Sequence, residues 1–120
     1  MYVDGFVLVI PKKNLAAYRK DAQLGARLWM KHGALDYKEC MADDIKPKGI
    51  SFTFPKMAKT KGNEIVFFSY IAYKSRTHRD QVNKKVMSDP AMNDPKQKNR
   101  SMPFDMKRFA YGGFKVFVGV

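Results

Sequence analysis

Two segments of the chain are apolar on both of the faces that a β-strand presents. Successive side chains of a strand point to opposite sides, so odd-numbered and even-numbered positions sort into two faces. In Tyr2–Ile10 the faces are Val3, Val7 and Val9 against Phe6, Leu8 and Ile10. In Ile65–Tyr73 they are Ile65, Phe67 and Ile71 against Val66, Phe68 and Tyr70. Both segments are therefore predicted to lie in a sheet that is buried on both sides.

A helical pattern follows each of these strands. After the first strand, Asn14 is the predicted N-cap of a helix that runs to His32, and Gly33 is its left-handed terminator. The apolar stripe of this helix recurs at helical spacing: Leu15, Tyr18, Ala22, Gly25 and Trp29. After the second strand, Ser75 is the predicted cap of a helix that runs to about Met87.

The remaining segments are less apolar. Ala34–Ala42 has mixed polarity and is predicted to form a strand at a sheet edge. Residues 43–63 are predicted to be a loop that holds a short extra strand at Ser51–Phe54. A second, proline-interrupted loop at residues 88–107 leads to a last strand at about Phe109–Val118, in which Gly112-Gly113 indicates a bulge or a bend.

The resulting order, β-α-β-β-α-β, is the ferredoxin-like arrangement of an α+β fold. Right-handed crossovers place both helices on one face, and residues 1–120 are predicted to form a single domain. The other face, about 400 Å² in projection, stays apolar and uncovered. Burying it is worth up to ~10 kcal/mol per subunit before association costs, so a homodimer is predicted.

Composition narrows the class of protein. The formal net charge of +12 favours a polyanion as partner, but the basic residues are spread over the first helix and both loops, without a consecutive block. No segment has the ~20 apolar residues of a membrane span, and the start of the chain lacks the layout of a secretory signal. Cys40 is the only cysteine, which excludes an internal disulfide. A cytoplasmic protein without membrane contact is expected.

Short motifs along nearly the whole chain resemble those of a known family. They are Tyr2-Val3-Asp4-Gly5-Phe6, Gly33-Ala34, Glu39-Cys40, Glu64, Arg79-Asp80, Asn83, Met87 to Pro90, Met102-Pro103-Phe104-Asp105 and Tyr111-Gly112-Gly113-Phe114. Together they resemble the YbaA-like proteins of unknown function, in the dimeric α+β barrel superfamily. The resemblance implies two subunits that pack sheet against sheet. It also implies a cavity between sheet and helices, which superfamily members use as monooxygenases, isomerases or ligand sensors, but it supplies no established activity or cofactor.

Three residues are candidates for catalysis. His78 lies in the first turn of the second helix and is expected to face the cavity, where related monooxygenases place a histidine for haem or substrate; packing at the helix start is the alternative. Asn83 is expected to face inward and orient a ligand or an oxygen, or else to bond a neighbouring loop. Asp4 interrupts an apolar strand, either as a general base or as the ion-pair partner of Lys115.

Further residues are candidates for contacts with a ligand: Trp29, His32, Phe68, Tyr70 and Arg79. Core packing is the alternative for Trp29, and stabilisation by the helix dipole is the alternative for His32. Glu39 and Glu64 are expected to approach each other across the second and third strands. No zinc, phosphate-loop or catalytic-triad signature is present, and no metal site is predicted.

RNA-recognition motifs share this topology and carry stacking aromatic residues on the third strand. Lys61 to Phe68 match their pattern in part, but Asn63 and Ile65 stand where bases would stack. A sheet face used for dimerisation is also closed to RNA. Nucleic acid is therefore disfavoured as a partner, except for weak binding through the basic helices or loops.

The sequence-based hypothesis is an enzyme that acts on a small apolar or aromatic molecule, such as a cofactor-independent or haem-type monooxygenase. Its cavity is expected to be roofed by residues 43–63 and 88–107. The alternatives are a non-catalytic sensor or carrier of such a molecule and a weak polyanion binder. The cofactor and the substrate stay unassigned.

Overall fold

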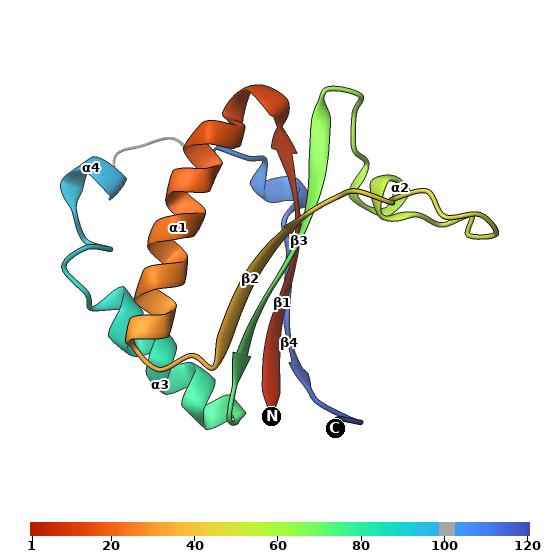
Figure 1. Ribbon diagram of the computed structural model, residues 1–120. Coiled ribbons are helices and arrows are strands. Elements are labelled where there is room, and N and C mark those ends of the chain that lie inside the picture. Colours follow the sequence, from red (N-terminus) through yellow and green to blue (C-terminus); the bar gives the residue numbers. More distant parts are fainter. Residues whose placement is uncertain (99–102) are drawn as a thin grey trace.

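The computed structural model describes residues 1–98 and 103–120 and shows a four-stranded sheet with two long helices on one side (Figure 1). The main elements are β1 (Tyr2–Pro11), α1 (Leu15–Lys31), β2 (Asp36–Met41), β3 (Glu64–Tyr73), α3 (Arg76–Met87) and β4 (Ala110–Lys115). Short helical segments stand between them: η1 (Lys12–Asn14), α2 (Phe54–Ala58), α4 (Pro95–Lys98) and η2 (Met106–Arg108). The predicted α+β order is confirmed.

The sheet is antiparallel and has the order β2-β3-β1-β4, which is the strand order of a ferredoxin-like fold. Its two central strands, β1 and β3, are the segments whose sequence is apolar on both faces. At an edge such a strand would leave apolar side chains without neighbours, so the central position follows from the sequence. The helices α1 and α3 cover one face, whereas α2 lies on the other side (Figure 1).

The core between sheet and helices draws on both central strands and both long helices. Its buried side chains are Leu8, Ile10, Tyr18, Leu28, Ile71, Tyr73, Val82 and Val86. In α3 the buried side chains are Val82 and Val86, which lie one helical turn apart. This helix therefore presents a narrow apolar stripe to the sheet and keeps its other faces polar.

The ends of the long helices test the capping predictions. Ser75 caps α3 as predicted, because its hydroxyl oxygen accepts the backbone N–H of His78 at 3.0 Å. Gly33 follows α1 with φ of +112°, in the predicted left-handed conformation. Asn14 precedes α1, but its side chain does not cap the helix and instead donates to the carbonyl of Pro103 at 2.8 Å. Asn14 thus connects the start of α1 to the segment that leads into β4.

The extra strand predicted at Ser51–Phe54 is wrong. Phe54 begins α2, and the side chain of Thr53 caps this helix by accepting the N–H of Lys56. Pro55 stands in the first turn, where a missing N–H costs nothing because that group would have no partner within the helix. Alternation over four residues is too short a signal to outweigh a cap and a proline.

The last strand, β4, is shorter than predicted and ends at Lys115. Gly112 and Gly113 pair regularly with Gly5 and Asp4 of β1, so the bulge predicted at the two glycines is wrong. A Cβ atom at Gly113 would overlap the hydroxyl of Tyr2. Glycine at this position therefore allows a close approach of a ring to the backbone rather than a bend.

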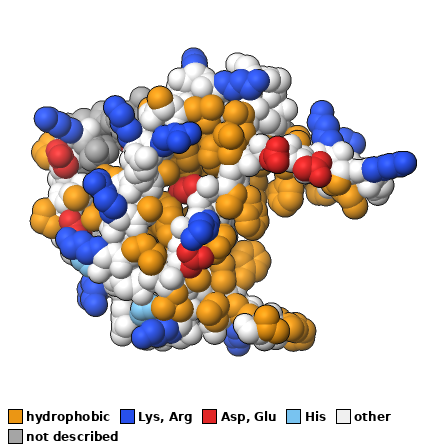
Figure 2. Space-filling view, in the orientation of Figure 1, with side chains coloured by type: hydrophobic (Ala, Val, Ile, Leu, Met, Phe, Trp, Pro, Cys, Tyr) orange, Lys and Arg blue, Asp and Glu red, His pale blue; other side chains and the backbone are white. Residues whose placement is uncertain are grey.

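The sheet face that looks away from α1 and α3 is apolar and only partly covered. The segment around α2 closes one end, where Ala58 packs with the buried Val9 and Val66. Elsewhere on this face Phe68 is 47% exposed and Phe114 is 62% exposed. Figure 2 shows hydrophobic side chains around a hollow between the projecting segment of α2 and the strand ends. The surplus apolar face expected from the sequence is present.

The outer surface of the helices is polar and strongly basic. Lys and Arg side chains stand out over α1, among them the exposed Arg19, Lys20 and Arg27 (Figure 2). In the parts of the chain that the structure describes, no helix is long and apolar enough to cross a membrane.

Replacing Gly113 should destabilise the fold because a methyl group would collide with the Tyr2 hydroxyl. We expect Gly113→Ala to lower the free energy of unfolding by about 1–3 kcal/mol, measured by urea denaturation. Gly62→Ala is the matched control, since a Cβ atom there meets nothing within 4 Å. Equal stability of the two variants would show that the Tyr2 ring moves aside at no cost in free energy, and that glycine is not required at position 113.

Candidate functional site

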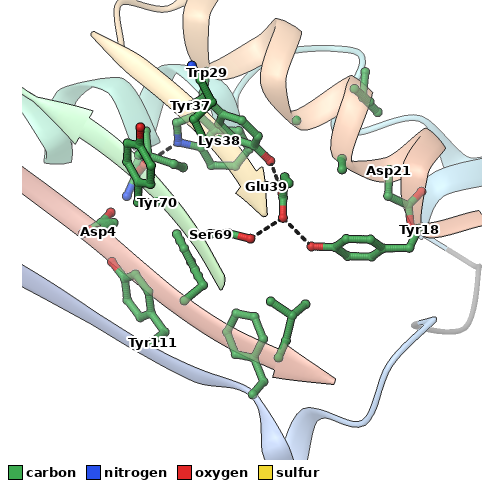
Figure 3. Close-up of a pocket in the computed structure, with 18 of the residues that line it drawn as sticks. Asp4, Tyr18, Asp21, Trp29, Tyr37, Lys38, Glu39, Ser69, Tyr70 and Tyr111 are labelled. Carbon is green, nitrogen blue, oxygen red and sulfur yellow. Dashed lines mark hydrogen bonds between the residues drawn. The ribbon is translucent and has the colours of Figure 1, made fainter. Parts of the chain in front are cut away.

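A cavity of about 630 Å³ lies between the sheet and the two long helices (Figure 3). Aromatic side chains form a large part of its wall: Phe6, Tyr18, Trp29, Tyr37, Phe104, Phe109 and Tyr111. The helices α1 and α3 contribute smaller residues as well, among them Ala22, Gly25 and Asn83. The size and the apolar wall are those of a site for a small molecule.

The strand register explains which side chains form the floor of this cavity. One row runs across all four strands: Tyr111 lies opposite Phe6, Phe6 lies opposite Ser69, and Ser69 lies opposite Glu39. Partners directly across an antiparallel pair point to the same face, so the whole row faces the helices. The row is aromatic on β4 and β1 and polar on β3 and β2.

Glu39 is the centre of a cluster of hydroxyl groups. Its Oε1 atom accepts hydrogen bonds from the Tyr18 hydroxyl at 2.7 Å and from the Ser69 hydroxyl. Its Oε2 atom accepts one from the Tyr37 hydroxyl at 2.7 Å. Figure 3 shows the three hydroxyls converging on this carboxylate. Burial raises the pKa of both tyrosines, and the nearby Glu39 raises it further, so both phenols remain donors at neutral pH.

A glycine in α1 makes room for this cluster. A Cβ atom at Gly25 would come within 2.8 Å of the Tyr37 hydroxyl oxygen. Any larger residue would therefore push Tyr37 away from α1 and strain its hydrogen bond to Glu39. The glycine that seemed only part of an apolar stripe has a specific role in the cavity wall.

A second polar group stands at the β4 side of the cavity. Asp4 is 1% exposed, and its Oδ1 atom accepts a hydrogen bond from the Arg79 guanidinium at 2.7 Å. The same guanidinium donates to the Tyr111 hydroxyl at 2.9 Å and lies 5.0 Å from the centre of the Tyr2 ring. Burial raises the pKa of Asp4, while the positive charge of Arg79 opposes that rise.

The ion pair expected between Asp4 and Lys115 is wrong. In the β1–β4 register Lys115 lies opposite Tyr2, and Asp4 lies opposite Gly113. The partner of Asp4 comes instead from α3, which the sequence could not place against β1. Arg79, expected to contact a ligand, is thus engaged by Asp4, Tyr111 and the neighbouring Asp80.

Trp29 and Asn83, two residues singled out from the sequence, meet in the cavity wall. The indole N–H of Trp29 donates to Asn83 Oδ1 at 3.0 Å, and the Tyr73 hydroxyl donates to the same atom at 3.3 Å. Asn83 therefore holds the indole in place between α1 and α3. Both residues line the cavity, and Asn83 faces inward from α3 as expected.

The two histidines are not among the residues that line the cavity. His78 Nδ1 accepts the backbone N–H of Lys74 at 2.9 Å, and its ring packs edge-on against Tyr73. The expectation that His78 faces the cavity is therefore wrong, because its ring is hydrogen-bonded to the turn before α3. His32 bonds Asp89 at 2.8 Å, and this hydrogen bond is the main cause that lowers the pKa of Asp89.

The two β3 candidates lie on the same face of the sheet. The alternation of β3 sends Phe67 and Ser69 toward the helices, so Phe68 and Tyr70 are oriented toward the other face. The ring of Phe68 packs there against Phe54 of α2. Tyr70 only borders the cavity, and its hydroxyl donates to Asp36 at 2.8 Å.

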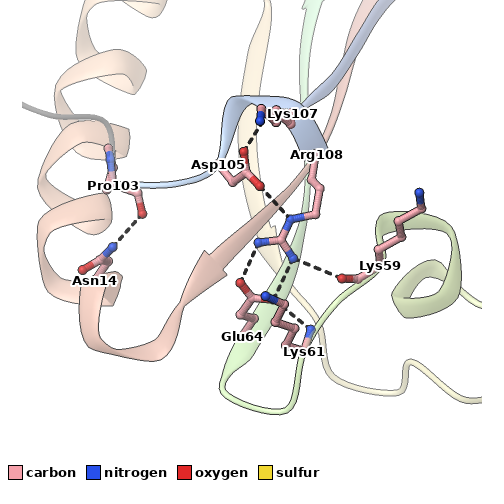
Figure 4. A network of polar contacts seen from close by, with 8 residues as sticks. All are labelled: Asn14, Lys59, Lys61, Glu64, Pro103, Asp105, Lys107 and Arg108. Atoms are coloured by element: carbon pink, nitrogen blue, oxygen red, sulfur yellow. Dashed lines mark hydrogen bonds and ion pairs between the residues drawn. The ribbon is translucent and has the colours of Figure 1, made fainter.

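Glu39 and Glu64 do not meet as expected. Glu39 lies opposite Ser69, whereas Glu64 lies opposite Pro11 at the far end of the sheet. Both oxygens of Glu64 accept hydrogen bonds from Arg108, each at 2.7 Å (Figure 4). Arg108 also contacts Asp105 at 3.1 Å and the carbonyl of Lys59 at 3.1 Å.

This network fixes the segment before β4, which carries two rings of the cavity wall. Phe104 and Phe109 stack with their centres 5.5 Å apart, and Phe104 also meets the ring of Tyr18 edge-on. The sequence offered one signal for this arrangement, the Met102-Pro103-Phe104-Asp105 motif, but it gave no indication that Arg108 pairs with Glu64.

The roof of the cavity differs from the expected one. The described part of segment 88–107 contributes Met92 and Phe104 to the wall, while residues 99–102 lie outside the described residues. Segment 43–63 contributes nothing to this wall and packs on the other face of the sheet. Within the described ranges, no group of three or more His, Cys, Asp or Glu side chains is arranged to hold a metal ion.

Comparisons with known proteins agree with the resemblance seen in the motifs. A family model described as "Protein of unknown function (DUF1428)" matches residues 1–106. The chain is 45% identical over 117 residues to proteins described as "Uncharacterized protein YbaA" from Escherichia coli (strain K12) and Shigella flexneri. The match covers 98% of this chain and 97% of each relative. The resemblance to the YbaA-like proteins is thus confirmed, and the descriptions assign no activity.

The pair of Glu64 and Arg108 should make stability depend on pH in the acid range. Hydrogen bonds from Arg108 lower the pKa of Glu64 from 4.5 to about 2. Because the folded pKa is the lower one, the stabilisation is complete above the unfolded pKa and is lost as the pH falls from 4.5 toward 2. We expect Glu64→Gln to lower the free energy of unfolding at pH 7 by about 2 kcal/mol and to flatten this acid slope.

Urea denaturation of both proteins at several pH values measures this slope. Asp43→Asn removes a carboxylate from an exposed loop position and should change stability by less than about 0.5 kcal/mol. An unchanged acid slope in Glu64→Gln would contradict the assigned role of the pair.

Proposed function

The chain belongs to the DUF1428 family of proteins of unknown function, so its relatives supply no activity, and we propose that it binds a small aromatic molecule in the cavity between sheet and helices. The single observation behind this proposal is the aromatic wall around about 630 Å³ of space. Sites for small molecules occupy roughly 300–1,000 Å³ and combine an apolar wall with a few polar groups.

The cavity wall differs from an ordinary core in how its rings are arranged. Protein cores are close-packed, and their aromatic rings fill the space between layers. In this cavity the rings of Phe6, Trp29 and Tyr111 surround space instead of filling it. Polar partners hold these rings: Asn83 bonds the Trp29 indole, and Arg79 bonds the Tyr111 hydroxyl. These hydrogen bonds preorganise the wall for a ligand.

Among the catalytic hypotheses, this geometry favours proton transfer over haem chemistry. Neither histidine lines the cavity, so the haem-type hypothesis loses its candidate ligand. Asp4 and Asn83 do line it, and Asp4 is a buried carboxylate whose pKa burial raises, which suits a general acid or base. Binding without turnover, as in a sensor or carrier, uses the same wall. Reversible binding is therefore the part of the function that every hypothesis shares.

The proposal includes a second copy of the chain on the open face of the sheet. That face, about 400 Å² in projection, falls short of the ~800 Å² that each partner of a stable dimer buries. Segment 43–63 around α2 and the end of the chain lie on the same side (Figure 1), and they carry exposed apolar residues that can add to it: Ile50, Phe52, Phe54, Met57, Phe117 and Val118. A two-fold axis would place this patch against its own copy.

Binding in the cavity can be tested with N-phenyl-1-naphthylamine, a neutral aromatic probe whose emission rises in apolar surroundings. Trp29 is the only tryptophan of the chain and lines the cavity, so energy transfer from its indole reports where the probe binds. We expect saturable binding, and Ala22→Phe, which fills the cavity from α1, should weaken it at least tenfold.

Ala16→Phe is the matched control because Ala16 is exposed on the same helix. It should bind the probe like the original chain. Equal binding by both variants would show that the probe lies elsewhere, and absence of binding by the unmodified chain would contradict the proposed function.

The assembly can be tested separately by sedimentation velocity. We expect a particle of two chains, twice 13.8 kDa, for the unmodified protein. Phe68→Lys introduces a charge on the open face and should yield single chains. Met30→Lys is the matched control, since Met30 is 46% exposed and Phe68 47%, but Met30 lies on α1. Single chains of the unmodified protein at micromolar concentration would contradict the dimer.

A further inference from the structure

Building on the proposed function, we infer that the natural ligand of the cavity is an aromatic molecule with a positively charged amine, and that Glu39 binds this amine. The inference rests on three observations: among the residues that the structure describes, Glu39 has no cationic partner, the hydroxyl donors around it are already engaged, and aromatic rings surround it. Together they describe a site for an organic ammonium ion rather than for a purely apolar molecule.

Among the charged side chains of the cavity wall, Asp4 and Lys38 have ion-pair partners in the described chain, whereas Glu39 has none. Asp4 forms an ion pair with Arg79 at 2.7 Å. Lys38, the only Lys or Arg among the described residues of the wall, pairs with Asp36. Glu39 accepts hydrogen bonds from three neutral hydroxyls, and within the described chain no ion pair of 4.0 Å or less includes it. Its negative charge is stabilised by dipoles and remains available to a cation.

Basic residues near Glu39 lie in an adjoining groove and do not neutralise it. Arg19 and Lys38 line this groove together with Glu39 and Tyr18. The Lys38 ammonium is bonded to Asp36, and no ion pair joins Arg19 to Glu39 in the described ranges. The carboxylate thus forms part of the wall between the groove and the cavity.

The neutral donors next to Glu39 are used by the protein itself. Tyr18, Tyr37 and Ser69 each give their hydroxyl hydrogen to Glu39, and the Trp29 indole gives its N–H to Asn83. What these groups still offer to a ligand is lone pairs, because a phenol or serine oxygen that donates can also accept. A ligand that brings hydrogen-bond donors therefore fits the part of the wall around Glu39 better than one that brings acceptors.

The rings next to Glu39 suit the same ligand. Tyr18 and Tyr37 contact the carboxylate directly, and the ring of Trp29 lies 6.3 Å from that of Tyr37. The face of an aromatic ring attracts a cation, and the attraction grows when water is excluded. A carboxylate among aromatic faces therefore binds an ammonium group while the rest of the wall holds its apolar part.

The overall charge of the chain predicts the opposite preference. A net charge of +12 attracts anions to the surface, where Lys and Arg stand over α1 (Figure 2). Next to the cavity wall, the Arg79 guanidinium is hydrogen-bonded to Asp4, Asp80 and Tyr111, so it is already engaged and is not placed to bind a carboxylate ligand. A preference for cations would thus come from the local wall and not from the chain as a whole.

Three probes with one scaffold distinguish these preferences: 2-phenylethylamine, 2-phenylethanol and phenylacetate are a cation, a neutral molecule and an anion at neutral pH. Their binding to the unmodified protein is measured by the emission of Trp29 and by titration calorimetry. We expect the amine to bind about tenfold more tightly than the alcohol, and phenylacetate to bind most weakly.

Glu39→Gln keeps the size and the acceptor oxygen of the side chain but removes its charge. We expect it to reduce the preference for the amine to within about twofold. Asp36→Asn is the matched control because it removes a carboxylate from the same strand, β2, and should keep the preference. If Glu39→Gln does not fold, the ranking of the three probes on the unmodified protein still tests whether the cavity prefers an amine.

Each outcome separates this inference from the proposed function. Equal binding of the three probes, or tightest binding of phenylacetate, overturns the inference, while binding of N-phenyl-1-naphthylamine in the cavity leaves the proposed function standing. A preference for the amine that persists in Glu39→Gln also overturns the role of Glu39. If neither the phenyl probes nor the naphthylamine binds, both proposals fail.

Discussion

The structure depends on the pairing of two strands that need apolar neighbours on both sides. β1 and β3 lie at the centre of the sheet and are registered along their full length, from Tyr2 opposite Tyr73 to Pro11 opposite Glu64. One face receives α1 and α3, whose contact with the sheet leaves a cavity. The other receives only the short α2 and stays open around Phe68. Both proposals, a ligand on one side and a second chain on the other, follow from this unequal cover.

Polar groups within an apolar layer give the cavity its chemistry. A carboxylate within an apolar layer is tolerated only when it is paired or hydrogen-bonded, and Asp4 and Glu39 meet that condition differently. Asp4 is neutralised by Arg79, so it connects α3 to β1 and completes one end of the wall. Glu39 is solvated by hydroxyls from α1, β2 and β3, which leaves its charge in place. The two acidic residues thus differ in environment, because Asp4 is almost fully buried and ion-paired whereas Glu39 is partly exposed and hydrogen-bonded to neutral groups.

The success of the sequence-based predictions depended on the distance between the residues involved. Ser75 as a cap, Gly33 as a terminator and the strand character of Tyr2–Ile10 were predictable, because each depends on the backbone within a few residues. The partner of Asp4 was not, because Arg79 is separated from it by most of the chain and Lys115 was an equally reasonable guess. His78 misled for a related reason: its helical position was right, but the backbone N–H of Lys74 holds its ring. The hydroxyl cluster at Glu39 could not be predicted from the sequence, because its serine and tyrosines form no recognisable motif.

By itself, the sequence determined the element order, the central strands, the apolar surplus of the sheet and the membership of a family whose activity is unassigned. These features are encoded in periodicity and local backbone chemistry, which act over a few residues. Only the tertiary structure decided that Glu39, Tyr18, Tyr37 and Ser69 share one site, and that Trp29 and Asn83 join its wall while both histidines do not. The physical reason is that strand register and helix packing bring distant residues together, and a shift of one residue would turn each side chain to the opposite face.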